Sequence, residues 1–298
     1  MNFTSAKELL KICKNESLPI SAVMKQREIT EGSLSESQIE EKLDTILTIM
    51  RESTHEPIKN PRKSMGGLIG GEAKKIIDHQ KANSHIAGEF LSNAIAYTMA
   101  VQEKNASMGL VVAAPTAGSA GVVPGLLFAL GEDKKLSEEA IKNGVLTASA
   151  IGYLLMLNAT VSGAEAGCQA EIGAASAMAA AAAVEVMGGT PNMCLDAAST
   201  ALSNLLGLVC DPIAGFVESP CQTRDALGVA NAITCAELAL SGITFAIPFD
   251  EMADAMYAVG KCLSPALRET AIGGCAGTPT GKAIACQRHN SVSNSAEE

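Results

Sequence analysis

The sequence predicts an all-α protein, and three observations carry this prediction. Aromatic residues make up only 3% of the 298 residues, tryptophan is absent, and alanine together with 27 glycines supplies much of the small-residue content. Such side chains pack by close approach of backbones, which favours helix on helix over a sheet rich in β-branched and aromatic residues. Apolar residues recur at helical spacing, and no convincing run alternates with a period of two.

The charged N-terminal part, residues 1–63, is expected to form a helical arm. Residues 4–16 have a helix-like mixed composition, and a second run of apolar residues recurs at helical spacing: Ile39, Leu43, Ile46 and Met50. Ser35 followed by Gln38 is the pattern of a capping box, so an amphipathic helix should begin there. Whether this arm packs on the core or on a partner chain is left open by its sequence.

Residues 64–286 are small and apolar and are expected to form the main helical domain, followed by a polar tail, residues 287–298. A helical pattern without interior proline covers 72–104, with a break or bend near Gly88. Ser137 precedes two acids, which the helix dipole favours in a first turn. Further helices are predicted over 165–187, over 191–206 with Thr190 as N-cap, over 224–241 and over 248–262.

Charge and hydropathy exclude two classes of partner. The formal net charge is −10 with a pI near 5.0, whereas phosphate binding needs clustered Lys and Arg. Two uncharged stretches, 105–131 and 143–164, contain prolines, glycines or polar residues, so we expect buried helices rather than membrane spans. The N-terminus lacks the pattern of a signal peptide. We therefore expect a cytoplasmic protein that binds neither nucleic acid nor membrane.

Four segments rich in glycine, proline and small residues separate the predicted helices, over 63–71, 114–124, 207–215 and 273–281. Glycine frees the backbone and hydroxyls add directional hydrogen bonds, so such a turn can close around an anion. Any one of them is equally well explained as a tight turn between closely packed helices. Four together favour a shared site.

Nine cysteines raise the question of which bind metal. Cys194 and Cys235 lie within apolar helical patterns and are expected to fill the core. Cys168 lies at a predicted helix start, and Cys210 and Cys221 lie in loops marked by proline, settings that favour the thiolate a metal requires. From residue 143 to 260 the only basic side chain is Arg224. The spacing is not a short C-x₂-C pattern, so spacing alone leaves ligation and packing both open.

Six segments together resemble a known family. They read Lys63-Ser-Met-Gly-Gly, Ala114-Pro-Thr-Ala-Gly-Ser-Ala-Gly, Gly163-Ala-Glu-Ala-Gly-Cys-Gln-Ala-Glu-Ile-Gly, Cys210-Asp-Pro-Ile-Ala-Gly, Pro220-Cys-Gln-Thr-Arg-Asp and Gly273-Gly-Cys-Ala-Gly-Thr-Pro-Thr-Gly-Lys. In this order they resemble the α subunit of the iron–sulfur-dependent bacterial L-serine dehydratases. The resemblance implies a compact all-helical catalytic domain over 64–286 with glycine-rich loops around a buried [4Fe–4S] site. Its three fixed ligands would be Cys168, Cys210 and Cys221.

The resemblance implies L-serine ammonia-lyase activity, the elimination of water from L-serine to give pyruvate and ammonia. A cluster iron without a protein thiolate can act as Lewis acid on the β-hydroxyl. Two turns are expected to bind the substrate carboxylate through the following residues: Ser64, Met65, Gly66, Gly67, Thr116, Ala117, Gly118 and Ser119. Arg224 binds that carboxylate, neutralises the thiolates of the cluster, or forms an ion pair with Asp225 or Asp211, and we favour the ion pair.

The general base is not identified by the sequence. Lys63 beside Ser64 is a candidate, although an unshifted lysine is protonated at neutral pH, and Glu165 and Glu171 are others. The histidines lie outside the motif segments and are expected on the surface or on helix faces: His55, His79, His85 and His289. Single-chain relatives carry an additional N-terminal domain. The resemblance therefore implies a separate β subunit in a hetero-oligomer, which is a further source for the base.

Two more cysteines are candidates for a fourth ligand that caps the open iron. Cys286 stands near the position of the terminal cysteine of some single-chain relatives, but twelve residues follow it. Cys275, in a Gly-Gly-Cys-Ala-Gly turn, is the competing candidate. Packing is the favoured role for both.

Three other functions are weighed against the lyase. A cluster-dependent L-cysteine desulfidase stays open, because a small pocket that accepts serine does not strongly exclude cysteine. A non-catalytic helical scaffold stays open as well and predicts a protein without iron. A PLP enzyme is disfavoured, because neither its α/β fold pattern nor the local context of its Schiff-base lysine is present.

Overall fold

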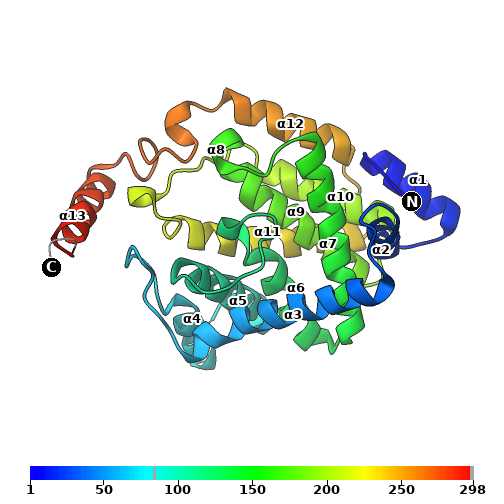
Figure 1. Cartoon of the computed structure of the whole chain (residues 1–298), viewed down its shortest axis with the longest axis horizontal. Coiled ribbons are helices and arrows are strands. Elements are labelled where there is room, and N and C mark those ends of the chain that lie inside the picture. The colour runs from blue at the N-terminus through cyan, green and yellow to red at the C-terminus, as the bar shows by residue number, and fades with distance from the viewer. Residues whose placement is uncertain (83–84, 296–298) are drawn as a thin grey trace.

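The computed structural model describes residues 1–82 and 85–295, with side chains described through residue 288, and this part of the chain is all-α as predicted (Figure 1). Its one strand-like feature is an isolated bridge between Cys210 and Arg268. The helices are α1 (Ala6–Glu16), α2 (Ile20–Thr30), α3 (Glu36–Lys59), α4 (Glu72–Lys81), α5 (Gly88–Ala106), α6 (Val122–Lys134), α7 (Glu138–Asn158), α8 (Gly163–Ala166), α9 (Ala174–Val186), α10 (Pro191–Asn204), α11 (Cys221–Leu240), α12 (Phe249–Cys262) and α13 (Pro279–Ser295).

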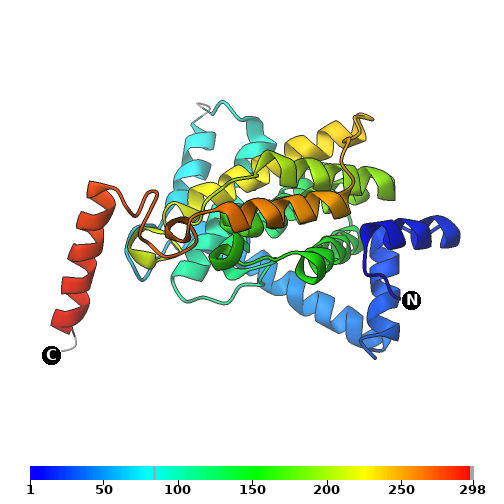
Figure 2. The same ribbon diagram turned by 90° about the horizontal axis from the view of Figure 1, so that it is seen from above.

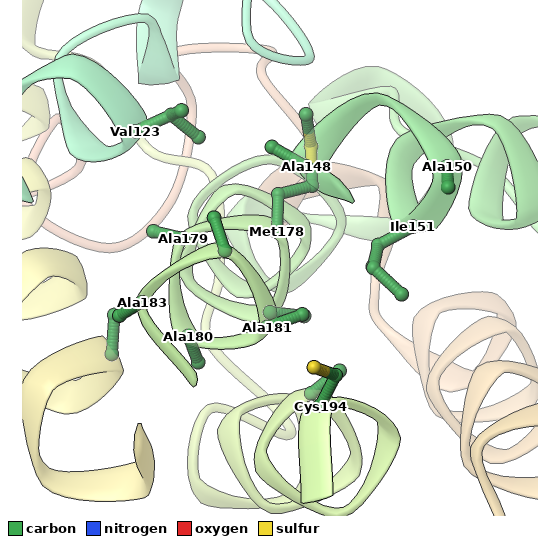
Figure 3. Packing of buried hydrophobic residues seen from close by; sticks show 14 of the residues in the cluster. Val123, Ala148, Ala150, Ile151, Met178, Ala179, Ala180, Ala181, Ala183 and Cys194 are labelled. Atoms are coloured by element: carbon green, nitrogen blue, oxygen red, sulfur yellow. The ribbon is translucent and has the colours of Figure 1, made fainter. Parts of the chain in front are cut away.

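The core is built around α9, in which eight of the thirteen residues are alanine. All its residues from Ala174 to Val184 are buried, and α6, α7, α10 and α11 pack around it (Figure 3). Because alanine side chains are short, the neighbouring backbones approach closely and van der Waals contact replaces interdigitated aromatic rings. Cys194 faces α9 from α10, and Cys235 lies on α11. Both are fully buried, which confirms their predicted role as core residues.

The N-terminal helices share the main hydrophobic core. Phe3, Leu9 and Ile20 are fully buried in the same cluster as α9. Two acids from the remainder of the chain accept backbone N–H groups at helix starts: Asp250 from Ala6 at 2.7 Å, and Glu185 from Ile20 at 2.9 Å. The division at residue 63 stays a prediction.

Local signals place most helix starts correctly. The capping box is present, with Ser35 N–H donating to Gln38 Oε1 at 2.8 Å and Gln38 N–H donating to Ser35 Oγ at 3.2 Å. Ser137 and Thr190 cap α7 and α10 in the same way. The predicted break near Gly88 is confirmed, since α4 ends at Lys81 and α5 begins at Gly88.

The continuous helix predicted over 165–187 is wrong. The segment forms α8, a π-helical turn η2 (Gln169–Gly173) and α9. Gly167 has φ of 77°, a left-handed conformation that ends α8 and that glycine adopts without steric cost. Cys168 therefore lies between two short helical pieces. π-helical turns of this kind are frequent at functional sites.

The helix predicted over 224–241 begins earlier than expected, at Cys221, so Cys221 is a helical residue rather than a loop residue. The Pro220 carbonyl accepts the Arg224 N–H at 3.0 Å. Proline is compatible with a helix start, where its missing N–H has no intrahelical partner. The proline that suggested a loop therefore stands just before the first turn of α11.

Two helices, α2 and α13, were not foreseen as such. The stretch 105–131 was expected to contain buried helices, and α6 begins within it at Val122. Residues 107–121 form a loop with one short turn, η1 (Ala117–Ser119), because its glycines and Pro115 interrupt the helical pattern. The last helix, α13, begins inside the fourth glycine-rich segment, extends into the predicted polar tail and stands away from the body (Figures 1 and 2).

Among the described residues one helix, α7, is long and apolar enough to cross a membrane. However, 61% of its most apolar window is buried inside the fold. It packs against α9 and α2, so it has the environment of a core helix.

Candidate functional site

Three cysteines from separate segments line one cavity of about 240 Å³. Its walls are Thr116, Ala117, Gly118, Cys168, Glu171, Cys210, Pro212, Val217, Cys221 and Glu269. The structure thus brings together the three predicted metal ligands and three of the predicted substrate-binding residues. Glu269 and Val217 were not singled out from the sequence.

Each cysteine is placed by a different local device. Cys168 follows the left-handed Gly167, and the next residue, Gln169, donates its N–H to the Leu208 carbonyl at 3.0 Å. Cys210 is held by the bridge to the 267–269 segment, donating its N–H to Leu267 at 2.9 Å and accepting the Glu269 N–H at 2.7 Å. Cys221 is the first residue of α11. All three side chains are buried.

The electrostatic environment keeps these thiols protonated in the protein alone. Burial raises the pKa of Cys168, Cys210 and Cys221 well above the ordinary value. Neighbouring acidic groups raise it further, Glu171 for all three thiols and Asp225 for Cys168 and Cys221. A thiolate there needs a positive partner, and a bound metal supplies one while releasing the proton.

Glu171 is the candidate base that lines the cavity. Thr116 Oγ1 donates to Glu171 Oε1 at 3.0 Å, and the Cys210 thiol lies 3.7 Å from Oε2. Burial raises the pKa of Glu171 to about 7, and the negative charge of Glu269 adds to the shift. Gly163 makes room for this carboxyl group, since a Cβ there would stand 2.9 Å from Glu171 Cδ and 3.1 Å from Cys210 Sγ.

The other two candidate bases lie outside the cavity lining. Glu165 accepts hydrogen bonds from Lys261 Nζ at 2.7 Å, Thr160 Oγ1 at 2.7 Å and Tyr257 OH at 3.0 Å. The bond to Lys261 is the largest of the effects that lower its pKa to about 2, so Glu165 is held as a carboxylate. Lys63 is exposed to solvent.

The first predicted substrate turn closes on itself beside the site. Ser64 Oγ donates to the Ile69 carbonyl at 3.0 Å, and Gly67 N–H donates to the Ser64 carbonyl at 3.0 Å. Gly66 N–H donates to Glu218, whereas the Met65 side chain is exposed. In the second turn, Ser119 is fully buried and its hydroxyl lies 3.0 Å from Thr116 Oγ1.

Two acids tie the other glycine-rich loops to the cavity wall, and the sequence analysis did not assign them this role. Glu218 holds the 63–71 loop, and Asp211 Oδ2 accepts the Cys275 N–H at 2.6 Å from the 273–281 loop. The available signal was the position of both acids beside cysteines, in a stretch almost free of basic residues. Two loops thus line the cavity, and two are attached to its walls.

Arg224 forms the ion pair that the sequence favoured. Its guanidinium lies 2.6 Å from Asp211 Oδ1 and also donates to the Val209 carbonyl at 2.7 Å. Asp225, the other acid considered as its partner, is fully buried, and neither of its carboxyl oxygens has a hydrogen-bond partner. Burial raises the pKa of Asp225 well above its usual range.

The remaining candidates lie apart from the cavity lining. Cys275 is half-buried in the loop bound to Asp211, whereas Cys286 is exposed on α13. His55 belongs to α3, with Nε2 3.0 Å from Glu132 Oε1, and the side chain of His289 lies outside the described residues. Within the described part of the chain, no three His, Cys, Asp or Glu residues form a group that could hold a metal ion.

Comparison with known proteins identifies relatives along almost the whole chain. The model of the family "Serine dehydratase alpha chain" matches residues 15–276. The probable L-serine dehydratase alpha chain of Bacillus subtilis is 44% identical over 95% of this chain and 94% of its own length. The L-serine dehydratase alpha chain of Peptoniphilus asaccharolyticus is 44% identical over 94% and 96%, respectively. L-serine dehydratase TdcG of Escherichia coli is 35% identical over 92% of this chain and 62% of its own length.

Proposed function

We propose, on the premise that the chain belongs to the serine dehydratase alpha chain family, that it is the catalytic α subunit of an L-serine ammonia-lyase. The reaction removes a proton from Cα and hydroxide from Cβ. The resulting aminoacrylate tautomerises to an imine, and water hydrolyses the imine to pyruvate and ammonia. The observation that carries the proposal is the cavity that joins three cysteines, a carboxyl group and a hydroxyl-bearing turn.

The residues of the cavity fit a [4Fe–4S] cluster by their chemistry. Iron–sulfur clusters are held by cysteine thiolates bound to separate irons, so their ligands surround a space rather than converge on one point. Cys168, Cys210 and Cys221 line such a space, and the unpartnered carboxyl group of Asp225 lies buried one turn after Cys221. These three cysteines would hold the cluster, with Cys275 or Cys286 as candidates for a fourth ligand. When bound, the cluster supplies a Lewis-acidic iron for the leaving hydroxyl group.

The turn at 116–119 is proposed to bind the substrate carboxylate. Thr116, Ala117 and Gly118 line the cavity in a short helical turn, and backbone N–H groups of such a turn can donate to a carboxylate. Ser119 orients the Thr116 hydroxyl from behind. The neighbouring turn at 64–67 lies outside the cavity lining, and its hydroxyl and N–H groups already have partners within the protein. This turn is therefore proposed to complete the wall of the substrate site rather than to donate to the carboxylate. Arg224, whose Nη1 contacts both Asp211 and Val209, is proposed to act through its positive charge, which favours the Cys168 thiolate.

Among the candidate bases named from the sequence, Glu171 is proposed to accept the Cα proton. A general base must reach the proton it removes, and among Lys63, Glu165 and Glu171 only Glu171 lines the cavity. Thr116 fixes one of its oxygens, which leaves the other directed to the Cys210 side. A β subunit is the alternative source of the base, and the two sources predict different activity for the isolated α chain.

We infer that this chain works with a β subunit in a hetero-oligomer. Two relatives matched over nearly their full length carry the name alpha chain, and TdcG extends well beyond the matched region. A cytoplasmic location, and the lack of nucleic-acid and membrane binding, stay predictions from the composition of the chain.

Anaerobic purification tests the proposal. We expect a brown protein with about four irons per chain that bleaches in air, and pyruvate release from L-serine when the β subunit is present. Sulfide release from L-cysteine in place of pyruvate would indicate the desulfidase. A colourless protein without iron after reconstitution would contradict the cluster and favour the scaffold. Full turnover by the reconstituted α chain alone would contradict the requirement for the β subunit.

A further inference from the structure

Glu218 joins two loops that lie far apart in the sequence. Gly66 N–H donates to Glu218 Oε1 at 2.6 Å, and Leu68 N–H donates to Oε2 at 2.9 Å. The side chain is only 2% exposed. Both views show the segment between α3 and α4 beside the segment that precedes α11 (Figures 1 and 2). One buried carboxylate therefore connects the 63–71 loop to the loop that leads into Cys221.

The backbone around Glu218 belongs to the cavity wall. Val217, immediately before it, and Cys221, three residues after it, both line the cavity. Gln102 Nε2 donates to the Val217 carbonyl at 2.6 Å, and the Gln222 N–H donates to the Glu218 carbonyl at 3.0 Å. Because the main chain is held on both sides, the carboxylate has a defined position from which to hold the second loop.

Gly66 is required by this contact. A Cβ at Gly66 would stand 2.8 Å from both Glu218 Oε1 and Phe216 Cγ, so any larger residue would push the carboxylate away. The backbone N–H group that the sequence suggested for a substrate carboxylate thus binds a carboxylate of the protein itself. The glycine in this motif serves an internal contact.

The contact specifically needs a carboxylate. Two N–H groups donate to two different oxygens, and hydrogen bonds to an ionised acceptor are stronger than neutral ones. Glutamine has nearly the same shape but offers one acceptor oxygen, and its NH₂ group would face the remaining N–H donor. Glu218→Gln therefore preserves volume while it removes one of the two bonds and the charge.

We propose that Glu218 is a positioning residue that fastens the 63–71 loop to the cysteine cavity and so places the Ser64–Gly67 turn for substrate binding. The kinetic part of this inference rests on the proposed function, whereas the contact between the loops does not. Loss of the carboxylate frees the loop, which raises the KM for L-serine by more than it lowers kcat.

Amide hydrogen exchange of the full chain tests the contact without any activity assay. In Glu218→Gln, we expect exchange over residues 64–69 to accelerate about tenfold or more. Glu103 offers a matched control, since it accepts the N–H groups of Gly71 and Ala73 at 3.0 and 2.8 Å in the adjoining segment. Glu103→Gln should accelerate exchange at 71–73 and spare 64–69. Unchanged exchange over 64–69 in Glu218→Gln would overturn the proposal.

Steady-state kinetics of the iron-loaded enzyme with its β subunit test whether Glu218 affects substrate binding. Glu218→Gln and Glu218→Ala should raise KM at least about fivefold, with a smaller change in kcat. Sodium formate should restore the KM of Glu218→Ala, because a small carboxylate can occupy the vacated position, whereas sodium chloride at equal ionic strength should not. An unchanged KM would refute the positioning role. A lowered KM would refute it too, by showing that Glu218 competes with substrate for the same N–H groups.

Two further measurements distinguish a failure of the proposed function from a failure of the positioning role of Glu218. If the wild-type holoenzyme releases no pyruvate, the proposed function is wrong, and hydrogen exchange still decides whether Glu218 fastens the loop. Thermal unfolding of each variant reports the fold. Glu218→Gln keeps the side-chain volume, so a folded Glu218→Gln protein decides the question even where Glu218→Ala is unstable.

Discussion

Gly163→Ala adds one methyl group against the Glu171 carboxyl group and the Cys210 thiol. The new Cβ would stand 2.9 Å from Glu171 Cδ and 3.1 Å from Cys210 Sγ, and a carboxyl oxygen, Glu171 Oε2, lies closer still. Gly163 is the first residue of α8 and is buried, so the backbone cannot move outward freely. The methyl group must therefore displace the Glu171 carboxyl group, the Cys210 thiol, or both.

The magnitude follows from the contacts that would be lost. Displacing Glu171 breaks its bond from Thr116, and a hydrogen bond to a charged group contributes about 1.5–3 kcal/mol. This loss falls on the site rather than on the core. Since about 1.4 kcal/mol corresponds to a factor of ten, we expect kcat/KM for L-serine to fall roughly tenfold or more.

Gly173→Ala is the matched control, because it adds the same methyl group in the adjacent π-helical turn. Its nearest neighbours would be Leu205 Cβ at 3.8 Å and Leu202 Cδ2 at 3.9 Å, which is ordinary contact. Iron per chain, kcat/KM with the β subunit and thermal unfolding are measured for both variants. If Gly163→Ala binds iron and turns over L-serine as well as Gly173→Ala does, the crowding argument is wrong.

Three further sets of substitutions test the proposed metal ligands, one helix cap and the pH dependence of stability. Serine replacement at each proposed ligand, Cys168, Cys210 or Cys221, should remove most of the iron. The control Cys262→Ser changes an exposed cysteine and should leave the iron content unchanged. If all three ligand variants retain their iron, these cysteines are not ligands. Thr190→Ala removes the N-cap of α10 and should cost about 1 kcal/mol, lowering Tm by about 2–4 °C, and an unchanged Tm would contradict the cap. Burial raises the pKa of Glu185 above its ordinary value of 4.5, so the folded protein holds this proton to higher pH than the unfolded chain does. Its contribution to the free energy of unfolding is therefore full below pH 4.5 and declines as pH rises through the folded pKa. The difference in free energy of urea unfolding between wild type and Glu185→Gln should therefore decline as pH rises. An increase with pH would show that folding lowers the pKa of Glu185 instead.

Local signals allowed much of the fold to be predicted. Ser35, Ser137 and Thr190 were identified as helix starts because a cap binds an N–H group only two or three residues away. The break at Gly88 and the buried settings of Cys194 and Cys235 were likewise visible in composition and periodicity. The π-helical turn after Cys168 was not, because the small residues on both sides suit a continuous helix equally well.

The sequence alone determined the helical class and the main helix starts, because each depends on neighbours within a turn. It also singled out, through recognisable segments, the three cysteines that line the cavity. Tertiary structure decided which groups share a cavity. It placed Glu171 against Cys210, left Glu165 in a surface network, paired Arg224 with Asp211 and gave the N–H groups of Gly66 and Leu68 to Glu218. These contacts join residues up to 152 positions apart. Which N–H or cationic donor each carboxylate binds depends on the distances between them, and only the packing of the helices fixes those distances.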